Sequence, residues 1–134
     1  MLVEKIEVIE LDDNIAKAII KLNEKGFVTD YCCGGHPDGA YIKFNRLTGY
    51  MLDDRMYGDK YKYIKKINHP VNWYVDRENI IDFVIRRKEF TQEEYLTYTD
   101  DQLSHIIAEE LYNWINLLPN LKTDNMQFRI IDED

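Results

Sequence analysis

The chain has few cysteines and no long apolar run. Its two cysteines, Cys32 and Cys33, are neighbours in a sequence of 134 residues. Adjacent cysteines cannot cross-link distant segments, which excludes a disulfide-stapled scaffold and is typical of a reducing compartment. The sequence contains no run of about 18 apolar residues, no signal peptide and no lipidation signal. We therefore expect no membrane insertion and a cytoplasmic location.

Internal repeats, linkers and low-complexity tracts are also missing. Hydrophobic residues make up 45% of the chain and aromatic residues 13%. At this length, such a composition is sufficient for a substantial hydrophobic core. The sequence therefore predicts one domain over residues 1–134.

Basic residues are outnumbered by acidic ones. The formal net charge of −8 argues against a general nucleic-acid binder. The charge balance is −3 for residues 1–45, +4 for 46–88 and −9 for 89–134. This uneven distribution is compatible with self-association into a homo-oligomer, with a local anion site, or with mimicry of nucleic acid toward a basic partner. The alternative is that the charge serves solubility alone.

Three segments of the chain carry helix signals. Asp12 or Asp13 can cap a helix that ends at Gly26. Thr91 and Thr99 begin two capping-box sequences, Thr-x-x-Glu and Thr-x-x-Gln. The second box precedes a long helix whose apolar stripe we assign to the core, formed by Leu103, Ile106, Ile107, Leu111, Trp114, Ile115 and Leu118.

Strands are predicted where apolar residues alternate with polar ones, while residues 46–70 are interpreted as irregular. An α+β domain, with helices packed on a largely antiparallel sheet, fits the resulting order of elements. The expected strands lie around residues 3–10, 27–32, 40–45 and 126–130, with a β-hairpin formed by 71–75 and 80–85.

The connection between two of these strands concentrates reactive side chains. Paired glycines let a ligand approach main-chain N–H groups, and here a thiol and an imidazole lie beside them. The alternative is a purely structural hairpin connection, because glycine, proline and aspartate suit such turns. We assign ligand contacts in this segment to Cys32, Cys33, Gly34, Gly35 and His36.

Two chemical alternatives stay open for the same segment. Cys33 and His36 are the residue types of a catalytic nucleophile and its base, although the sequence indicates no third residue to orient the base. Cys32, Cys33 and His36 could also bind zinc together with His69 or His105, although structural zinc sites usually have two ligand clusters. We predict neither a metal nor a cofactor.

Aromatic and basic residues further along the chain suggest contacts to a nucleotide. Aromatic rings stack on bases, and cations pair with phosphate. We therefore predict that Tyr61, Tyr63 or Trp73 stacks a base. Arg86 or Arg87, at the expected exit of the hairpin, would neutralise the charge of the phosphate. The alternative is that the tyrosines of residues 46–70 pack as a flap over the core while the lysines between them are merely solvated.

The segments 22–29, 32–36 and 41–44 resemble a group of small, mostly uncharacterised phage and prophage proteins. Those proteins carry a helix, a strand and a Cys-Cys-Ser-Gly-His turn, and Gly34 here replaces the serine. The turn is also similar, over a few residues, to the Ser-Cys-Ser-Gly-Arg motif of the tRNA wybutosine-synthesizing proteins, with His36 in the place of the arginine. The first resemblance implies a phage setting, in which small acidic proteins often bind a host defence component or its nucleotide signal.

The residue patterns predict a non-enzymatic protein that captures an anionic, nucleotide-like molecule. The resemblance implies that this capture would serve as a phage counter-defence. Two other functions stay open. One is an acidic inhibitor that binds a basic host defence protein. The other is a Cys/His or metal-dependent enzyme.

Overall fold

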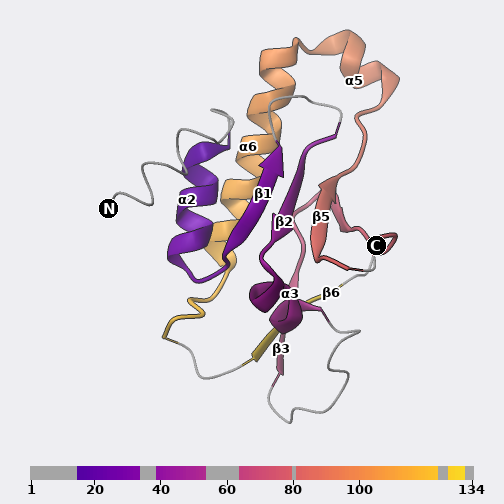
Figure 1. Ribbon diagram of the computed structural model, residues 1–134. Coiled ribbons are helices and arrows are strands. Elements are labelled where there is room, and N and C mark those ends of the chain that lie inside the picture. Colours follow the sequence, from indigo (N-terminus) through magenta and orange to yellow (C-terminus); the bar gives the residue numbers. More distant parts are fainter. Residues whose placement is uncertain (1–14, 34–38, 54–63, 80, 124–126, 132–134) are drawn as a thin grey trace.

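The larger sheet consists of four antiparallel strands in the order β1-β2-β5-β4, and a separate parallel pair is formed by β3 and β6 (Figure 1). The computed structural model describes residues 15–33, 39–53, 64–79, 81–123 and 127–131. The predicted α+β class with a largely antiparallel sheet is confirmed. The strands are β1 (Thr29–Cys33), β2 (Tyr41–Phe44), β3 (Ile64–Asn68), β4 (Trp73–Val75), β5 (Val84–Arg87) and β6 (Gln127–Ile131).

Two helices, α2 (Ala16–Glu24) and α6 (Asp100–Leu117), pack against each other, and α6 passes behind β1 and β2 in Figure 1. Each helix buries one apolar face, as its spacing predicts. The core therefore lies between these helices and the inner face of the larger sheet. Buried side chains are Ala18, Ile19 and Leu22 of α2, and Leu103, Ile107, Leu111, Trp114 and Ile115 of α6.

The C-terminal ends of α2 and α6 are held together. Gly26 ends α2 with a φ of +93°, and a Cβ at this position would lie 2.9 Å from the Cβ of Leu121. Glycine is therefore required here by both conformation and space. The ammonium group of Lys25 donates to the carbonyl oxygens of Ile115 at 2.6 Å and Leu118 at 2.8 Å. It thus caps the end of α6, whose last turn contains no basic residue.

Both predicted capping boxes are present. Helix α5 (Gln92–Thr97) has Thr91 as its N-cap, and α6 has Thr99. In each case the threonine hydroxyl accepts from the third helical N–H, and the side chain of that third residue accepts from the threonine N–H. These local contacts explain why both helix starts could be located from sequence.

The prediction that residues 46–70 are irregular is wrong. They contain β3 and the helix α3 (Arg46–Leu52), which begins where the Asn45 side chain accepts a hydrogen bond from the Thr48 N–H at 2.8 Å. Strand β3 pairs in parallel with β6. Its burial gives little local signal, because Lys65 and Lys66 are exposed beside the buried Ile67.

The predicted hairpin exists, but its second strand begins later than expected. Strands β4 and β5 are antiparallel partners, and β5 starts at Val84 rather than at residue 80. The Asn79 side chain accepts from the N–H groups of Ile81 and Asp82, which turns the backbone before the strand can begin. Arg86 and Arg87 therefore lie within β5, not at the exit of the hairpin.

The predicted strand around 3–10 lies outside the described residues. The prediction that Asp12 or Asp13 caps the helix is wrong, because the N-cap of α2 is Ile15, which makes no side-chain cap hydrogen bond. None of the helices that the structure describes combines the length and the hydrophobicity that a transmembrane span requires.

Candidate functional site

We call the face of the four-stranded sheet that points away from α6 the outer face. The alternating burial of residues in β2 shows which of its side chains lie there. Ile42 and Phe44 are buried in the core. Because successive side chains of a strand point to opposite faces, Tyr41 and Lys43 lie on the outer face. These two half-buried side chains define the middle of the candidate site.

The register of the neighbouring strands adds further polar and aromatic residues to this face. Tyr31 of β1 lies opposite Lys43, and Arg86 of β5 lies opposite Tyr41. Tyr74 of β4 is in turn opposite Arg86. Side chains from four strands thus form one surface.

Tyr31, Tyr41 and Arg86 form a stack across three adjacent strands. The rings of Tyr31 and Tyr41 are nearly parallel, with an interplanar angle of 11° and centroids 6.0 Å apart. The guanidinium carbon of Arg86 lies 5.1 Å from the centroid of the Tyr41 ring. Tyr31 is 63% exposed at the open end of this stack. An exposed ring supported from behind is a surface on which a further planar group can stack.

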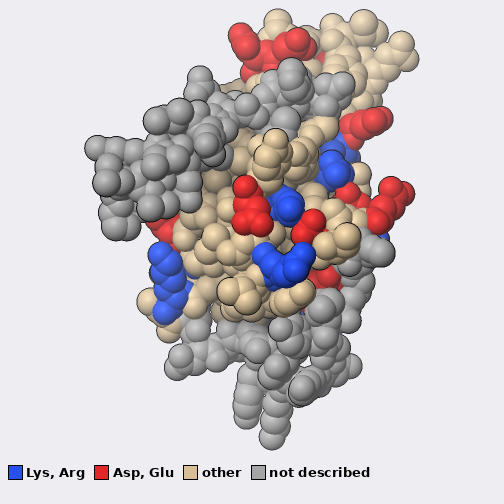
Figure 2. Space-filling view, viewed as in Figure 1, with Lys and Arg blue, Asp and Glu red and all other residues tan. Residues whose placement is uncertain are grey.

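Carboxylates pair with Arg86 and Lys43, the cations that the described part of the chain places on the outer face. The Nε of Arg86 lies 2.6 Å from Oδ2 of Asp76, and the Nζ of Lys43 lies 3.5 Å from Oδ2 of Asp82. Figure 2 accordingly shows basic and acidic side chains interspersed in the middle of this view, without a large patch of one sign. Beside Asp82, a hollow lined in part by Arg46 has a volume of about 20 Å³. It has room for about one water molecule, so this hollow is too small for a nucleotide.

The pKa of Asp76 reflects opposing effects. Burial raises the pKa, but the hydrogen bond and charge of Arg86 and backbone N–H groups of Glu78 and Asn79 lower it more strongly. The pKa of Asp76 is therefore below its ordinary value in the folded protein. This carboxylate stabilises the fold at pH values above its unfolded pKa, and the contribution is lost as the pH falls through the folded pKa.

We expect Asp76→Asn to flatten the acid side of the pH–stability curve. Near pH 7 the variant should be less stable by about 1 kcal/mol, because an uncharged amide binds Arg86 more weakly. As the pH falls through the folded pKa of Asp76 the two proteins should converge, because the wild-type carboxyl then becomes protonated as well. Urea unfolding at a series of pH values measures this difference, with Glu78→Gln as a control for the loss of one acidic group. Parallel curves for Asp76→Asn and wild type would refute the assignment.

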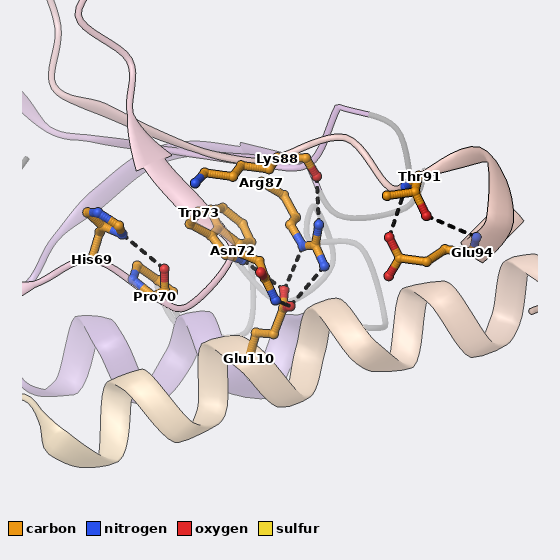
Figure 3. A network of polar contacts seen from close by, with 9 residues as sticks. All are labelled: His69, Pro70, Asn72, Trp73, Arg87, Lys88, Thr91, Glu94 and Glu110. Atoms are coloured by element: carbon orange, nitrogen blue, oxygen red, sulfur yellow. Dashed lines mark hydrogen bonds and ion pairs between the residues drawn. The ribbon is translucent and has the colours of Figure 1, made fainter. Parts of the chain in front are cut away.

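Arg87 belongs to a separate network on the inner side of the sheet (Figure 3). Its Nε and Nη2 donate to the two carboxylate oxygens of Glu110 on α6 at 2.8 and 2.9 Å. The same carboxylate accepts from Nε1 of Trp73 at 3.1 Å and from Nδ2 of Asn72 at 2.8 Å. The guanidinium carbon of Arg87 also lies 4.0 Å from the ring centroid of Phe90. This network joins the sheet to α6.

Two residues predicted to contact a ligand are therefore core residues. Trp73 is 0% exposed and Arg87 is 7% exposed. Both side chains are buried and bonded to Glu110, so neither reaches the outer face of the sheet. Cys32 lies opposite the buried Ile42 and packs against the core, so its side chain points away from the outer face.

The remaining predicted ligand residues are only partly within the described chain. The backbone of Cys33 ends β1 opposite Tyr41, but its side chain lies outside the described residues. So do Gly34, Gly35, His36, Tyr61 and Tyr63. Arg86 is the one predicted ligand residue whose described side chain lies on the outer face. Among the residues that the structure describes, no group of three or more His, Cys, Asp and Glu side chains is arranged to hold a metal ion.

Comparisons with known proteins add no family to this description. No protein-family model, curated protein or solved structure matches the chain. The candidate site therefore depends on its own geometry.

Sequence reasoning missed Tyr31, Tyr41 and Lys43 as candidate ligand residues. The signal was present in residues 40–44, where alternation places Tyr41 and Lys43 on one face. The contribution of Tyr31 required the register between β1 and β2, which includes an irregularity between Thr29 and Tyr31. Such an irregularity changes which residues share a face.

Proposed function

We propose that the protein binds a nucleotide-like molecule on the outer face and catalyses no reaction on it. The stack of Tyr31, Tyr41 and Arg86 carries this proposal. A base placed on the exposed ring of Tyr31 would extend the stack by one member. Base–aromatic stacking is worth about 1–3 kcal/mol and tolerates different bases.

Lys43 is suited to contact the phosphate of such a molecule. It lies opposite Tyr31 in the register of β1 and β2, and directly opposed side chains of two strands are close neighbours. Its pairing with Asp82 is loose, at 3.5 Å, with a third of the Lys43 side chain exposed. Such a pair is weak, so a phosphate can compete for the ammonium group.

Arg86 has a supporting role in this proposal. Its short contact with Asp76 and its position over Tyr41 hold the second ring of the stack. The balanced charges of the face imply that stacking, rather than net charge, supplies most of the affinity. In the phage setting that the resemblance implies, capture of such a molecule would remove a host defence signal from solution.

Calorimetry with a panel of ligands tests this function. The panel contains nucleosides, their monophosphates, and linear and cyclic dinucleotides. Tyr31→Ala should weaken binding of all ligands by about 5- to 150-fold, which corresponds to the loss of one stacking contact. Lys43→Gln should weaken only the phosphorylated ligands, because a nucleoside offers no charge to the ammonium.

The matched control is Tyr98→Ala, which removes a tyrosine that is 41% exposed at the end of α5. It should leave binding unchanged. All three variants should melt near the wild-type temperature, because the replaced side chains are not in the core. Absence of binding by the wild type to every member of the panel would overturn the proposal, as would equal binding by Tyr31→Ala and wild type.

A further inference from the structure

Helix α5 exposes apolar side chains and buries none of its residues. Leu96 is 81% exposed, and Tyr95 is 40% exposed. Figure 1 shows that α5 projects beyond the N-terminal end of α6, away from both sheets. Tertiary packing therefore adds little to the stability of α5, although most short helices in proteins are stabilised by such packing.

Local contacts hold α5 in place instead. The capping box of Thr91 fixes its start, and that of Thr99 begins α6 directly after it. The Tyr95 ring packs edge-on against the buried Phe90, with centroids 6.0 Å apart. Leu96 is thus presented on an ordered backbone. A preorganised surface of this kind loses little conformational entropy when it binds a partner.

The surroundings of Leu96 are strongly acidic. Residues 89–121 contain seven acidic residues and neither lysine nor arginine. In Figure 2, the end of the molecule that carries α5 shows acidic and uncharged side chains but no basic ones. This charge repels nucleic-acid phosphates and anionic lipid headgroups, and it attracts a basic protein surface. Glu93 and Glu94 lie within α5, and Glu89, Asp100 and Asp101 are the acidic residues nearest to it in sequence.

We propose that α5 and the first turn of α6 form a docking surface for a basic protein. Leu96 enters an apolar pocket of the partner, and lysine and arginine side chains around that pocket face the acidic residues. Burial of Leu96 supplies affinity, while the surrounding charges accelerate association and make it sensitive to salt. This surface is independent of the outer face of the sheet.

Fluorescence anisotropy with a synthetic probe tests this surface. The probe is a labelled amphipathic peptide of about 15 residues, made only of lysine and leucine, because this length can form a helix with one basic and one apolar face. The wild type should bind it, and binding should weaken at least tenfold between about 50 and about 300 mM salt as the charges are screened. Leu96→Ser should weaken binding about tenfold, since it removes the apolar anchor. Glu89→Gln combined with Glu93→Gln and Asp101→Asn should weaken binding and reduce the salt dependence.

Matched controls come from the same chain. Leu117→Ser removes a leucine that is 84% exposed at the other end of α6, and Glu109→Gln removes an exposed carboxylate; both should bind like wild type. A peptide of glutamate and leucine should not bind. Absence of binding to the lysine peptide, or equal weakening by Leu96→Ser and Leu117→Ser, would overturn the proposal. Sedimentation showing a wild-type dimer that Leu96→Ser dissociates would assign the surface to a second copy and overturn it as well.

Discussion

Replacing Glu110 with alanine should lower the free energy of unfolding by about 3–5 kcal/mol. The side chains of Arg87 and Glu110 are 4% and 11% exposed. Removing the carboxylate leaves the guanidinium charge buried without its counter-charge. It also removes the acceptor of the Trp73 indole N–H and of the Asn72 amide. Urea unfolding followed by tryptophan fluorescence measures the loss, because Trp73 itself lies in this network.

Two further variants separate the buried charge from the loss of a carboxylate. Glu109→Ala removes the exposed neighbour on α6 and should change stability by less than about 0.5 kcal/mol. Arg87→Met combined with Glu110→Leu should recover much of the loss, because an apolar pair of similar size leaves no buried charge. If Glu110→Ala were no more destabilising than Glu109→Ala, the network would not hold the sheet on α6.

Arg86 and Arg87 show what can and cannot be predicted from the sequence. Alternation predicts that neighbouring strand residues point to opposite faces. The sequence does not indicate whether Arg86 or Arg87 points toward the core. That choice is made by the pairing of Ile85 with Ile42 and by the turn at Asn79, which sets where β5 begins. The two arginines therefore have different roles, one on the outer face and one in a buried ion pair.

Local signals account for most of what could be predicted. The capping threonines and the stop at Gly26 depend only on nearby residues, and the corresponding helix ends were predicted correctly. The parallel pair β3–β6 joins segments about 60 residues apart, with Lys66 opposite Arg129 in its register. No periodicity within either segment signals that pairing. The candidate ligand stack similarly depends on the register of three strands, whereas the cysteine turn is predicted as a ligand site from its composition alone.

The second large effect is expected from Leu111→Ala in the middle of α6. Leu111 is 0% exposed in the core, and its spacing from Ile107 and Ile115 places all three on the buried face of the helix. Shortening the side chain removes apolar contacts and leaves a cavity that the packed neighbours only partly fill. We expect the free energy of unfolding to fall by about 2–5 kcal/mol. Urea unfolding with an unchanged slope would assign the loss to the native core rather than to the denatured state.

Leu117→Ala provides the matched comparison, because it is the same substitution on the same helix. Leu117 is 84% exposed, so truncation removes few contacts and creates no cavity. It should change stability by less than about 0.5 kcal/mol. Similar small losses for both variants would mean that the stripe of α6 is a partner surface rather than core. A large loss confined to Leu111→Ala would instead establish that α6 packs on the sheet through this face. The buried stripe would then not be a binding surface, unlike the docking surface proposed for α5 and the first turn of α6.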